Sequence, residues 1–313
     1  MYKILKLSLF LSSVLLYASC QSPVATEKKT KSEEKVRLDF MPYKGIRYHE
    51  VKRRFSNGLS FDSIGFQQEP SWIIQFESND SIMAYSPQKL KMQGFHLHYD
   101  HGDVYNFAKE WFRIKKINKD SVTMQRLFVS GKEIARDIRS DVNLTFYAED
   151  YIKKLNTTAE VLQRPSAKDT AFIRGLSARA NRYPTQRDSV FAGRQPVQLI
   201  PKSKSISVEK ISSVDVLNGK TEAYDYLYPN YRIVVRKAYK EFGYSFTVLV
   251  DEHGKMTLGT FTGAIEEYRH VREKVLKGII DVYLQNLLTV RPATTLGIAH
   301  VSEISVSVKG KTD

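Results

Sequence analysis

The sequence has very little cysteine, few prolines and no long uninterrupted apolar stretch. Only one of the 313 residues is cysteine, which excludes a disulfide framework within the chain. Ten prolines are too few for a long proline-rich spacer. No run of about 18 or more uncharged apolar residues occurs, so no transmembrane helix is expected.

What is present indicates a folded and basic protein. Hydrophobic residues make up 42% of the chain, enough for a substantial core, so wholesale disorder is excluded. The length favours about two domains. The formal net charge is +14, which favours partners with negative charge.

The first twenty residues have the pattern of an export signal. Lys3 and Lys6 precede an apolar run of about ten residues, too short for a membrane span but typical of a secretory leader. Tyr17-Ala18-Ser19-Cys20 follows, and it resembles the lipobox of bacterial lipoproteins, with tyrosine where leucine is usual. The resemblance implies cleavage before Cys20 and lipid attachment at that residue. The alternative is a plain secretory signal with an incidental cysteine.

The expected organisation begins with a signal peptide over residues 1–19 and an anchor with a polar tether over residues 20–40. Loss of Lys3 and Lys6 with the signal peptide lowers the net charge to +12. In lipoproteins of the Bacteroides type an acidic cluster directly after the cysteine would resemble a surface-export signal, and none follows Cys20. We therefore expect a lipid-anchored protein of the outer membrane that faces the periplasm.

Residues 41–163 have the pattern of an antiparallel β domain. Short alternating segments with polar turns occur at regular spacing, for example at 71–76, 82–85, 111–117, 122–129 and 142–147. This pattern predicts a sandwich or a barrel, followed by a helix at 149–155. Residues 111–129 loosely resemble strands of small lipocalin-like lipoproteins, which implies, as an alternative function, a carrier of a small apolar ligand.

One motif in this domain has the spacing of metal ligands. His96, His98, Asp100 and His101 form H-x-H-x-D-H, which is similar to the zinc signature of metallo-β-lactamase-like hydrolases. The surrounding residues differ from that family, because no apolar strand leads into the motif and the next histidine is His253. The same alternation fits an exposed strand face that runs into a turn. We therefore assign no metal ligand or catalytic residue, and a metal-dependent hydrolase stays as a lesser alternative.

Residues 164–217 are predicted to be a basic connector. From residue 164 to residue 240 there are 15 lysines and arginines against 6 acidic residues, and three prolines interrupt any long helix. Such a segment is either a solvated connector or a patch for an anionic partner, such as lipid head groups. No nucleic-acid-binding motif is present.

Residues 218–313 predict a small α+β domain of order αββαβ. Apolar residues at helical spacing indicate a helix over 231–242, a hairpin turns at 251–254, a second helix spans 266–288, and alternation at 304–308 marks a final strand. This order resembles the C-terminal domain of TonB-like energy transducers. The resemblance rests on Tyr228-Pro229, on the Val250–Lys255 turn and on Arg291-Pro292-Ala293 before the last strand.

The resemblance implies a sheet that contacts an envelope protein by pairing with an extended peptide. TonB proteins also carry an N-terminal transmembrane helix and a proline-rich spacer, which this chain lacks, so energy transduction is not expected. The chain has no phosphate-binding glycine loop, no G-x-S-x-G elbow and no cysteine besides Cys20. We therefore expect a non-catalytic docking module without a cofactor.

Overall fold

The computed structural model describes residues 37–212, 214, 221–263 and 265–313. Residues 37–313 group as one compact unit. The signal peptide, Cys20 and most of the tether lie outside the described residues, so these assignments stay predictions. No helix in the described ranges is long and apolar enough to cross a membrane.

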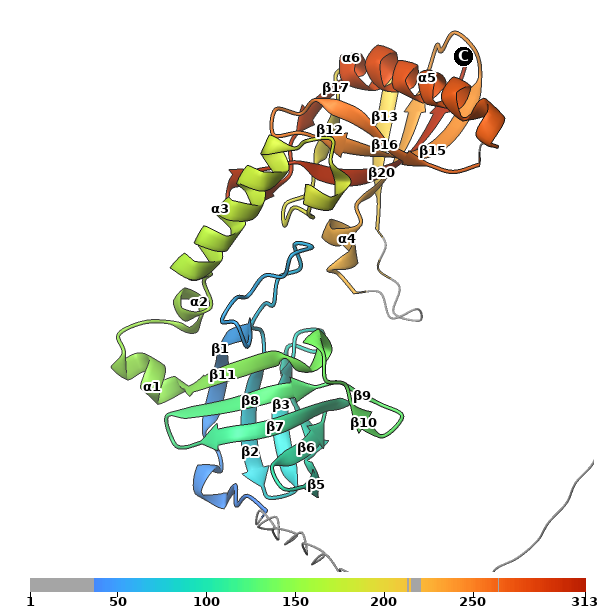
Figure 1. Ribbon diagram of the computed structural model, residues 1–313. Helices are drawn as coiled ribbons and strands as arrows, with labels where there is room; N and C mark the ends of the chain where they lie inside the picture. The colour runs from blue at the N-terminus through green and yellow to red at the C-terminus, as the bar shows by residue number, and fades with distance from the viewer. Residues whose placement is uncertain (1–36, 213, 215–220, 264) are drawn as a thin grey trace, which may run out of the picture. The chain divides into compact units, whose positions relative to one another are not determined.

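The N-terminal part of this unit is a nine-stranded antiparallel sheet that curls into a nearly closed, barrel-like form (Figure 1). A short helical turn, η1 (Met41–Tyr43), precedes it. The strands are β1 (Arg47–Phe55), β2 (Ile73–Ser78), β3 (Ser81–Ser86), β4 (Lys91–His96), β5 (His98–His101), β6 (Val104–Phe107), β7 (Glu110–Ile117), β8 (Ser121–Leu127) and β11 (Val142–Ala148). The strand segments expected from the alternating pattern are confirmed.

A single residue joins the two edges of this sheet. The strand order is β4-β3-β2-β1-β11-β8-β7-β6-β5, so β4 and β5 are its edges, and only Leu97 separates them in the chain. The Leu97 side chain is fully buried, and its N–H donates to Asp80 O at 2.9 Å. Continuity of the chain at Leu97 therefore brings the edges together.

Aromatic side chains fill the interior of the barrel-like sheet. Phe40 stacks on Phe76 with ring centroids 4.6 Å apart, and Tyr105 meets Phe40 edge-on at 5.2 Å. All three rings are fully buried. Edge-on and stacked rings of this kind add to the hydrophobic stabilisation of a core.

Short elements follow β8 and β11. The hairpin of β9 (Val129–Ser130) and β10 (Glu133–Ile134) and the turn η2 (Ile138–Ser140) lie between β8 and β11. The helix expected after β11 is confirmed as α1 (Glu149–Lys154), and α2 (Ala159–Leu162) comes next.

The stretch expected to be an irregular connector is largely ordered secondary structure. It contains α3 (Ala167–Arg182), η3 (Arg187–Ser189), β12 (Gln198–Pro201) and β13 (Ile206–Ile211). The sixteen-residue α3 begins in a capping box, in which Ser166 and Asp169 bond each other's backbone N–H groups. The prolines fall outside α3, so they do not interrupt it.

The C-terminal part is a five-stranded sheet of order β13-β14-β20-β15-β16. A helical segment lies across one face of the sheet (Figure 1). The remaining elements are α4 (Tyr224–Leu227), β14 (Asn230–Val235), β15 (Phe242–Val250), β16 (Met256–Phe261), η4 (Glu266–Tyr268), α5 (Arg269–Ile279), η5 (Ile280–Leu284), α6 (Gln285–Leu287), β17 (Leu288–Arg291), β18 (Thr294–Thr295), β19 (Ile298–Ala299) and β20 (Ser302–Gly310).

The αββαβ order is wrong at its first helix. Most of strand β14 lies in the segment expected to be a helix, residues 231–242. This strand pairs in parallel with β20 and antiparallel with β13. Tyr231, Ile233 and Val235 are buried on one face, and the run from Ile233 to Val235 is β-branched, which favours a strand. The hairpin, the second helical segment and the final strand are confirmed. A TonB-like fold of this domain stays a proposal.

A third apolar cluster connects the two parts of the unit. It comprises Phe61 from the segment after β1, Ile173, Leu176 and Ala180 from α3, Phe191, Leu249 from β15, and Val301. The predicted boundaries at residues 163/164 and 217/218 therefore divide a chain whose elements share a core, and they stay predictions.

Candidate docking edge

β13 is an edge strand with unpaired backbone groups. The N–H of Arg236 donates to Ser205 O at 2.8 Å, directly before the paired residues Ile206 and Val235. Hydrogen-bonded and non-hydrogen-bonded pairs alternate in an antiparallel ladder. The N–H and C=O groups of Val208 and Lys210 therefore point away from β14, and no hydrogen bond to them occurs in the described part of the chain.

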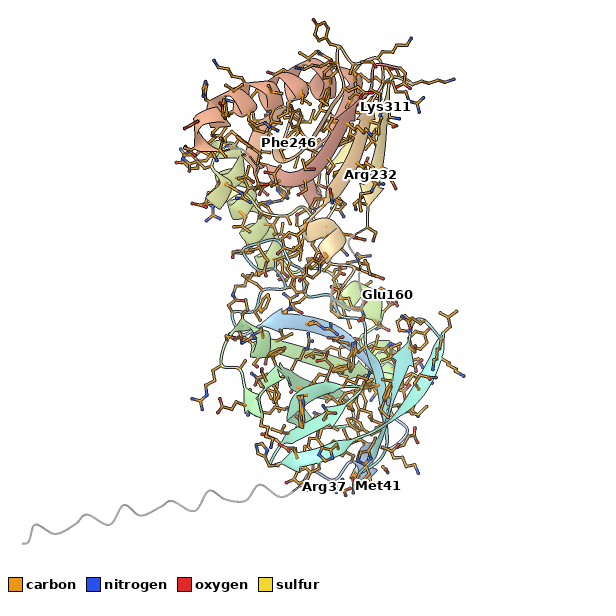
Figure 2. All side chains as sticks on the ribbon, turned by 90° about the vertical axis from the view of Figure 1, so that its right-hand side faces the viewer. Arg37, Met41, Glu160, Arg232, Phe246 and Lys311 are labelled. Atoms are coloured by element: carbon orange, nitrogen blue, oxygen red, sulfur yellow. The ribbon has the colours of Figure 1, made fainter. Side chains whose placement is uncertain are left out.

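The strand is regular enough to accept another strand. All six residues of β13 pair with β14 in continuous register, without a bulge or a proline. Glu209 and Arg232, the latter labelled in Figure 2, form an ion pair of 2.8 Å across the two strands. Exposed, regular edges of this kind are templates for pairing with another chain.

A hollow of about 560 Å³ lies beside this edge. Val208, Lys210 and Tyr231 contribute from the sheet, and residues 194–199 form the opposite wall. In strand addition, main-chain hydrogen bonds provide affinity and pockets for alternate side chains provide specificity. The edge and the hollow together supply both features.

Of the charged and polar side chains that line this hollow, Arg194 and Tyr231 already have partners, whereas Lys210 forms no ion pair with a described residue. Arg194 pairs with Glu69 at 2.8 Å and lies over the Tyr226 ring at 4.6 Å. Burial raises the pKa of Tyr231 to about 12, and its hydroxyl donates to Val197 O. Lys210 is exposed and forms no ion pair with a described residue. Its ammonium group is therefore available to bind a carboxylate.

The opposite edge of the sheet, β16, is less suited to strand addition. Met256 N–H donates to the side-chain oxygen of Gln285 at 2.9 Å, and the Gln285 amide donates to Gly254 O at 3.3 Å. The pairing of β16 with β15 also shifts register between Phe246 and Val248. A side chain thus occupies the start of this edge, and an irregularity follows it.

The histidine motif lies on the outer surface of the barrel-like sheet. His96 ends β4, and His98, Asp100 and His101 lie in β5, with all four side chains exposed. The rings of His96 and His98 are 6.1 Å apart, and His101 Nδ1 lies 2.5 Å from Asp100 Oδ2. Among the described residues, no group of three or more His, Cys, Asp or Glu side chains is arranged to hold a metal ion.

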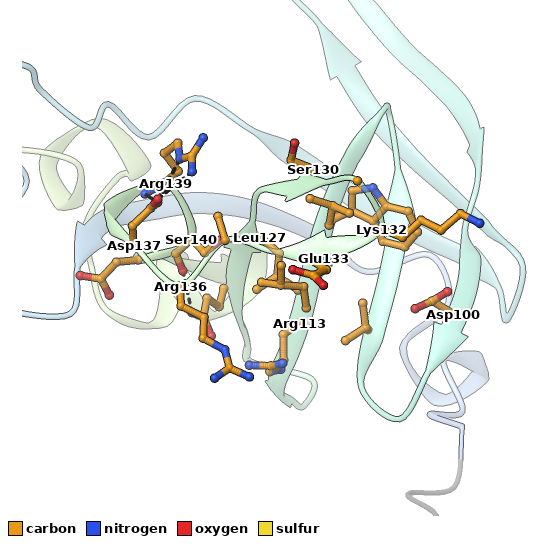
Figure 3. A pocket seen from close by; sticks show the side chains of 18 of the residues that line it. Asp100, Arg113, Leu127, Ser130, Lys132, Glu133, Arg136, Asp137, Arg139 and Ser140 are labelled. Carbon is orange, nitrogen blue, oxygen red and sulfur yellow. Dashed lines mark hydrogen bonds and ion pairs between the residues drawn. The ribbon is translucent and has the colours of Figure 1, made fainter.

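A larger hollow of about 1710 Å³ lies near this motif, between β5–β8 and residues 129–141. Its lining includes Asp100 and His101 together with Trp111 and Arg113, and Figure 3 shows the labelled charged side chains around it. Arg113 pairs with Asp103 at 3.3 Å. Both cations and carboxylates line this hollow, so its charge favours neither an anionic nor a cationic ligand.

The packed interior of the sheet does not favour the carrier alternative. Phe107 and Phe112 stack at 4.7 Å, and Trp72 packs edge-on against both rings at 5.6 and 5.5 Å. These aromatic side chains contact one another where a lipocalin-like ligand would have to lie.

Reasoning from the sequence missed β13 as a candidate site. The pattern of Ile206, Val208 and Lys210 alternating with Ser207 and Glu209 is typical of a half-exposed strand, but it lay inside a stretch interpreted as a connector. Compared with known proteins, the chain matches no protein-family model and no curated protein.

Proposed function

We propose that this chain is a lipid-anchored protein of the bacterial envelope that acts as a non-catalytic docking module. Its C-terminal sheet receives an extended segment of an envelope protein at the β13 edge. The observation that carries the proposal is that the N–H and C=O groups of Val208 and Lys210 point outward, bond no described residue and lie beside a hollow that fits a side chain. Anchoring at Cys20 and a position at the outer membrane, facing the periplasm, are part of the same proposal.

The hairpin and the final strand, together with the resemblance to TonB C-terminal domains, support peptide pairing as the mode of contact. β20, the last strand, lies between β14 and β15, so both of its edges are occupied. Among the described strands, β13 is the regular edge that has a partner on one side only.

The test uses two substitutions at one position. Lys210→Pro removes an outward N–H without removing a ladder hydrogen bond to β14, whereas Lys210→Ala removes only the side chain. We expect crosslinked protein partners in native membranes to fall at least tenfold, on the order of one kcal/mol or more, with the proline variant and much less with the alanine variant. Circular dichroism shows whether both variants are folded.

A second measurement separates strand addition from other contacts. When the captured partner is added to the purified chain, hydrogen exchange at the Val208 and Lys210 amides should slow, because these groups become hydrogen-bonded. Equal capture by the proline and alanine variants, or unchanged exchange at both amides, would contradict docking at β13.

A further inference from the structure

Six cations gather at one end of the five-stranded sheet, and they come from three separate segments. We call this surface the basic end, and it comprises Lys204, Arg236, Lys237, Lys240, Lys309 and Lys311. It lies where β13 and β15 begin and where β14 and β20 finish. In Figure 2, side chains with nitrogen tips project around the labelled Lys311.

Backbone hydrogen bonds hold the three segments together. Arg236 N–H donates to Ser205 O at 2.8 Å, which joins the start of β13 to the end of β14. Ala238 N–H donates to Lys311 O at 2.7 Å, which joins the β14–β15 loop to the residues after β20. The buried Ala238 side chain fixes the same loop in the core. The cations therefore share a surface that the fold defines.

The basic end has an excess of uncompensated positive charge. None of its six cations forms an ion pair with a described residue. The three segments contain two acidic residues, Glu241 and Asp313, within residues 204–205, 236–241 and 309–313. By contrast, Arg187 and Arg194 in the arginine-rich stretch pair with Glu303 and Glu69. Free lysines and arginines near an anionic membrane surface each contribute about 1 kcal/mol of binding.

An aromatic residue projects from the middle of this charge. Tyr239 is 94% exposed and lies between Lys237 and Lys240 in the β14–β15 loop. Its backbone N–H donates to the Tyr283 hydroxyl at 3.2 Å, so the main chain is held while the ring faces outward. Tyrosine is enriched at the level of lipid headgroups, because its ring is apolar and its hydroxyl is polar.

We propose that the basic end binds the surface of an anionic phospholipid bilayer. The six cations would contact headgroup phosphates, and the Tyr239 ring would lie at headgroup level between them. A soluble polyanion would bind the cations but would not contact the exposed Tyr239 ring. The presence of both the cations and the ring therefore favours a bilayer surface as the ligand. This contact is separate from the proposed peptide edge, and it would give an anchored chain a second point of attachment.

The test is co-sedimentation with vesicles of residues 20–313, the chain without the predicted signal peptide, with Cys20→Ser in every sample so that neither the apolar leader nor an acyl chain contributes. Phosphatidylglycerol mixed with phosphatidylcholine is compared with phosphatidylcholine alone. We expect preferential binding to the anionic vesicles that weakens with added salt. The triple variant Lys237→Ala/Lys240→Ala/Lys311→Ala should lower the partition coefficient about 100-fold, and Tyr239→Ser should lower it further.

The matched control is Lys89→Ala/Lys119→Ala/Lys132→Ala, which removes the same net charge from exposed positions elsewhere. It should retain most of the binding. The proposal is overturned if both triple variants lose binding equally, or if the two vesicle types bind alike. It is also overturned if free inositol hexakisphosphate binds the basic end and Tyr239→Ser leaves vesicle binding unchanged, since the surface would then recognise a soluble polyanion.

Discussion

Arg54 Nη1 lies 2.7 Å from Asp169 Oδ2, and this ion pair connects β1 with the first turn of α3. Asp169 is fully buried, yet its carboxylate also accepts hydrogen bonds from the N–H groups of Ser60 and Ser166, each at 2.7 Å. Burial by itself raises the pKa of Asp169, but these bonds outweigh it and lower the pKa to about 2. The carboxylate is therefore ionised and bonded throughout the physiological range.

Removal of this carboxylate should destabilise the fold strongly. Asp169→Ala leaves Arg54 and the Ser60 N–H without their partner, and loss of one side of a buried ion pair costs about 3 kcal/mol or more. Urea unfolding measures the change. Asp150→Ala is the control, since Asp150 is exposed, and its pair with Lys153 at 3.4 Å should contribute less than about 1 kcal/mol. A similar loss in both variants would contradict the role of Asp169.

Stability should fall in mild acid because of His300. Its ring is fully buried and stacks on Phe191, with centroids 3.7 Å apart. Nδ1 lies 3.0 Å from Val301 O and Nε2 lies 3.0 Å from Thr295 Oγ1. Burial lowers the pKa of His300 from 6.5 to about 4, although the bond to Val301 opposes the shift.

Between pH 6.5 and pH 4 the unfolded chain binds a proton at His300 that the folded chain excludes, so unfolding becomes easier as the pH falls. The shift corresponds to about 3 kcal/mol lost over this window. Burial also lowers the pKa of His49, which adds a loss of the same sign. Thermal unfolding across the window should show a flatter pH dependence for His300→Gln than for the exposed control His253→Gln. Equal slopes would exclude His300 as the cause.

Substitution by alanine should reduce stability by different amounts at two glycines that have positive φ. At Gly65, with φ of +93°, an added Cβ would collide with Ala192 O, in the region where the segment after β1 approaches residue 192. At Gly45, with φ of +76°, nothing lies within 4 Å. Gly65→Ala should therefore cost well over 2 kcal/mol, whereas Gly45→Ala should cost only the left-handed backbone energy of about 1–2 kcal/mol. Chemical denaturation of both variants checks the order.

The aromatic interior predicts a large cavity effect at Phe76. Phe76→Ala removes a fully buried ring that stacks on Phe40, and such deletions cost about 3–5 kcal/mol. The exposed Leu90→Ala should change stability by less than about 0.5 kcal/mol. We expect the truncated core to bind a small apolar fluorescent probe that the parent chain does not bind. Strong binding by the parent chain would favour the carrier function instead.

Local pattern predicted the elements whose partners are adjacent in sequence. Trp111 and Leu127 are paired in β7 and β8 as neighbouring alternating strands should be, and the β15–β16 hairpin turns at Gly254. The alternation of apolar and polar residues predicts the strands, and the turn residues predict where the chain reverses between them. The outward orientation of His96 and His98 follows from the same alternation.

Long-range pairing could not be read from local pattern. Tyr231, Val234, Val235 and Ala238 fit a helical stripe, and Tyr231, Ile233 and Val235 fit a strand equally well. The parallel ladder between β14 and β20 decides between them, and it joins residues about 75 positions apart. The capping box of Ser166 and Asp169 was a local signal for α3, but the general basic character of the stretch obscured it.

The sequence by itself determined that the chain has a β-rich N-terminal part, a basic balance of charge and a hairpin–helix–strand ending. These features depend on contacts between residues near in sequence. Only the tertiary structure decided that β13 is an edge strand of the described sheet, that β20 is central and that six cations from three segments share one surface. Each depends on which distant segments pair, and the spacing of residues along one segment does not record its partner.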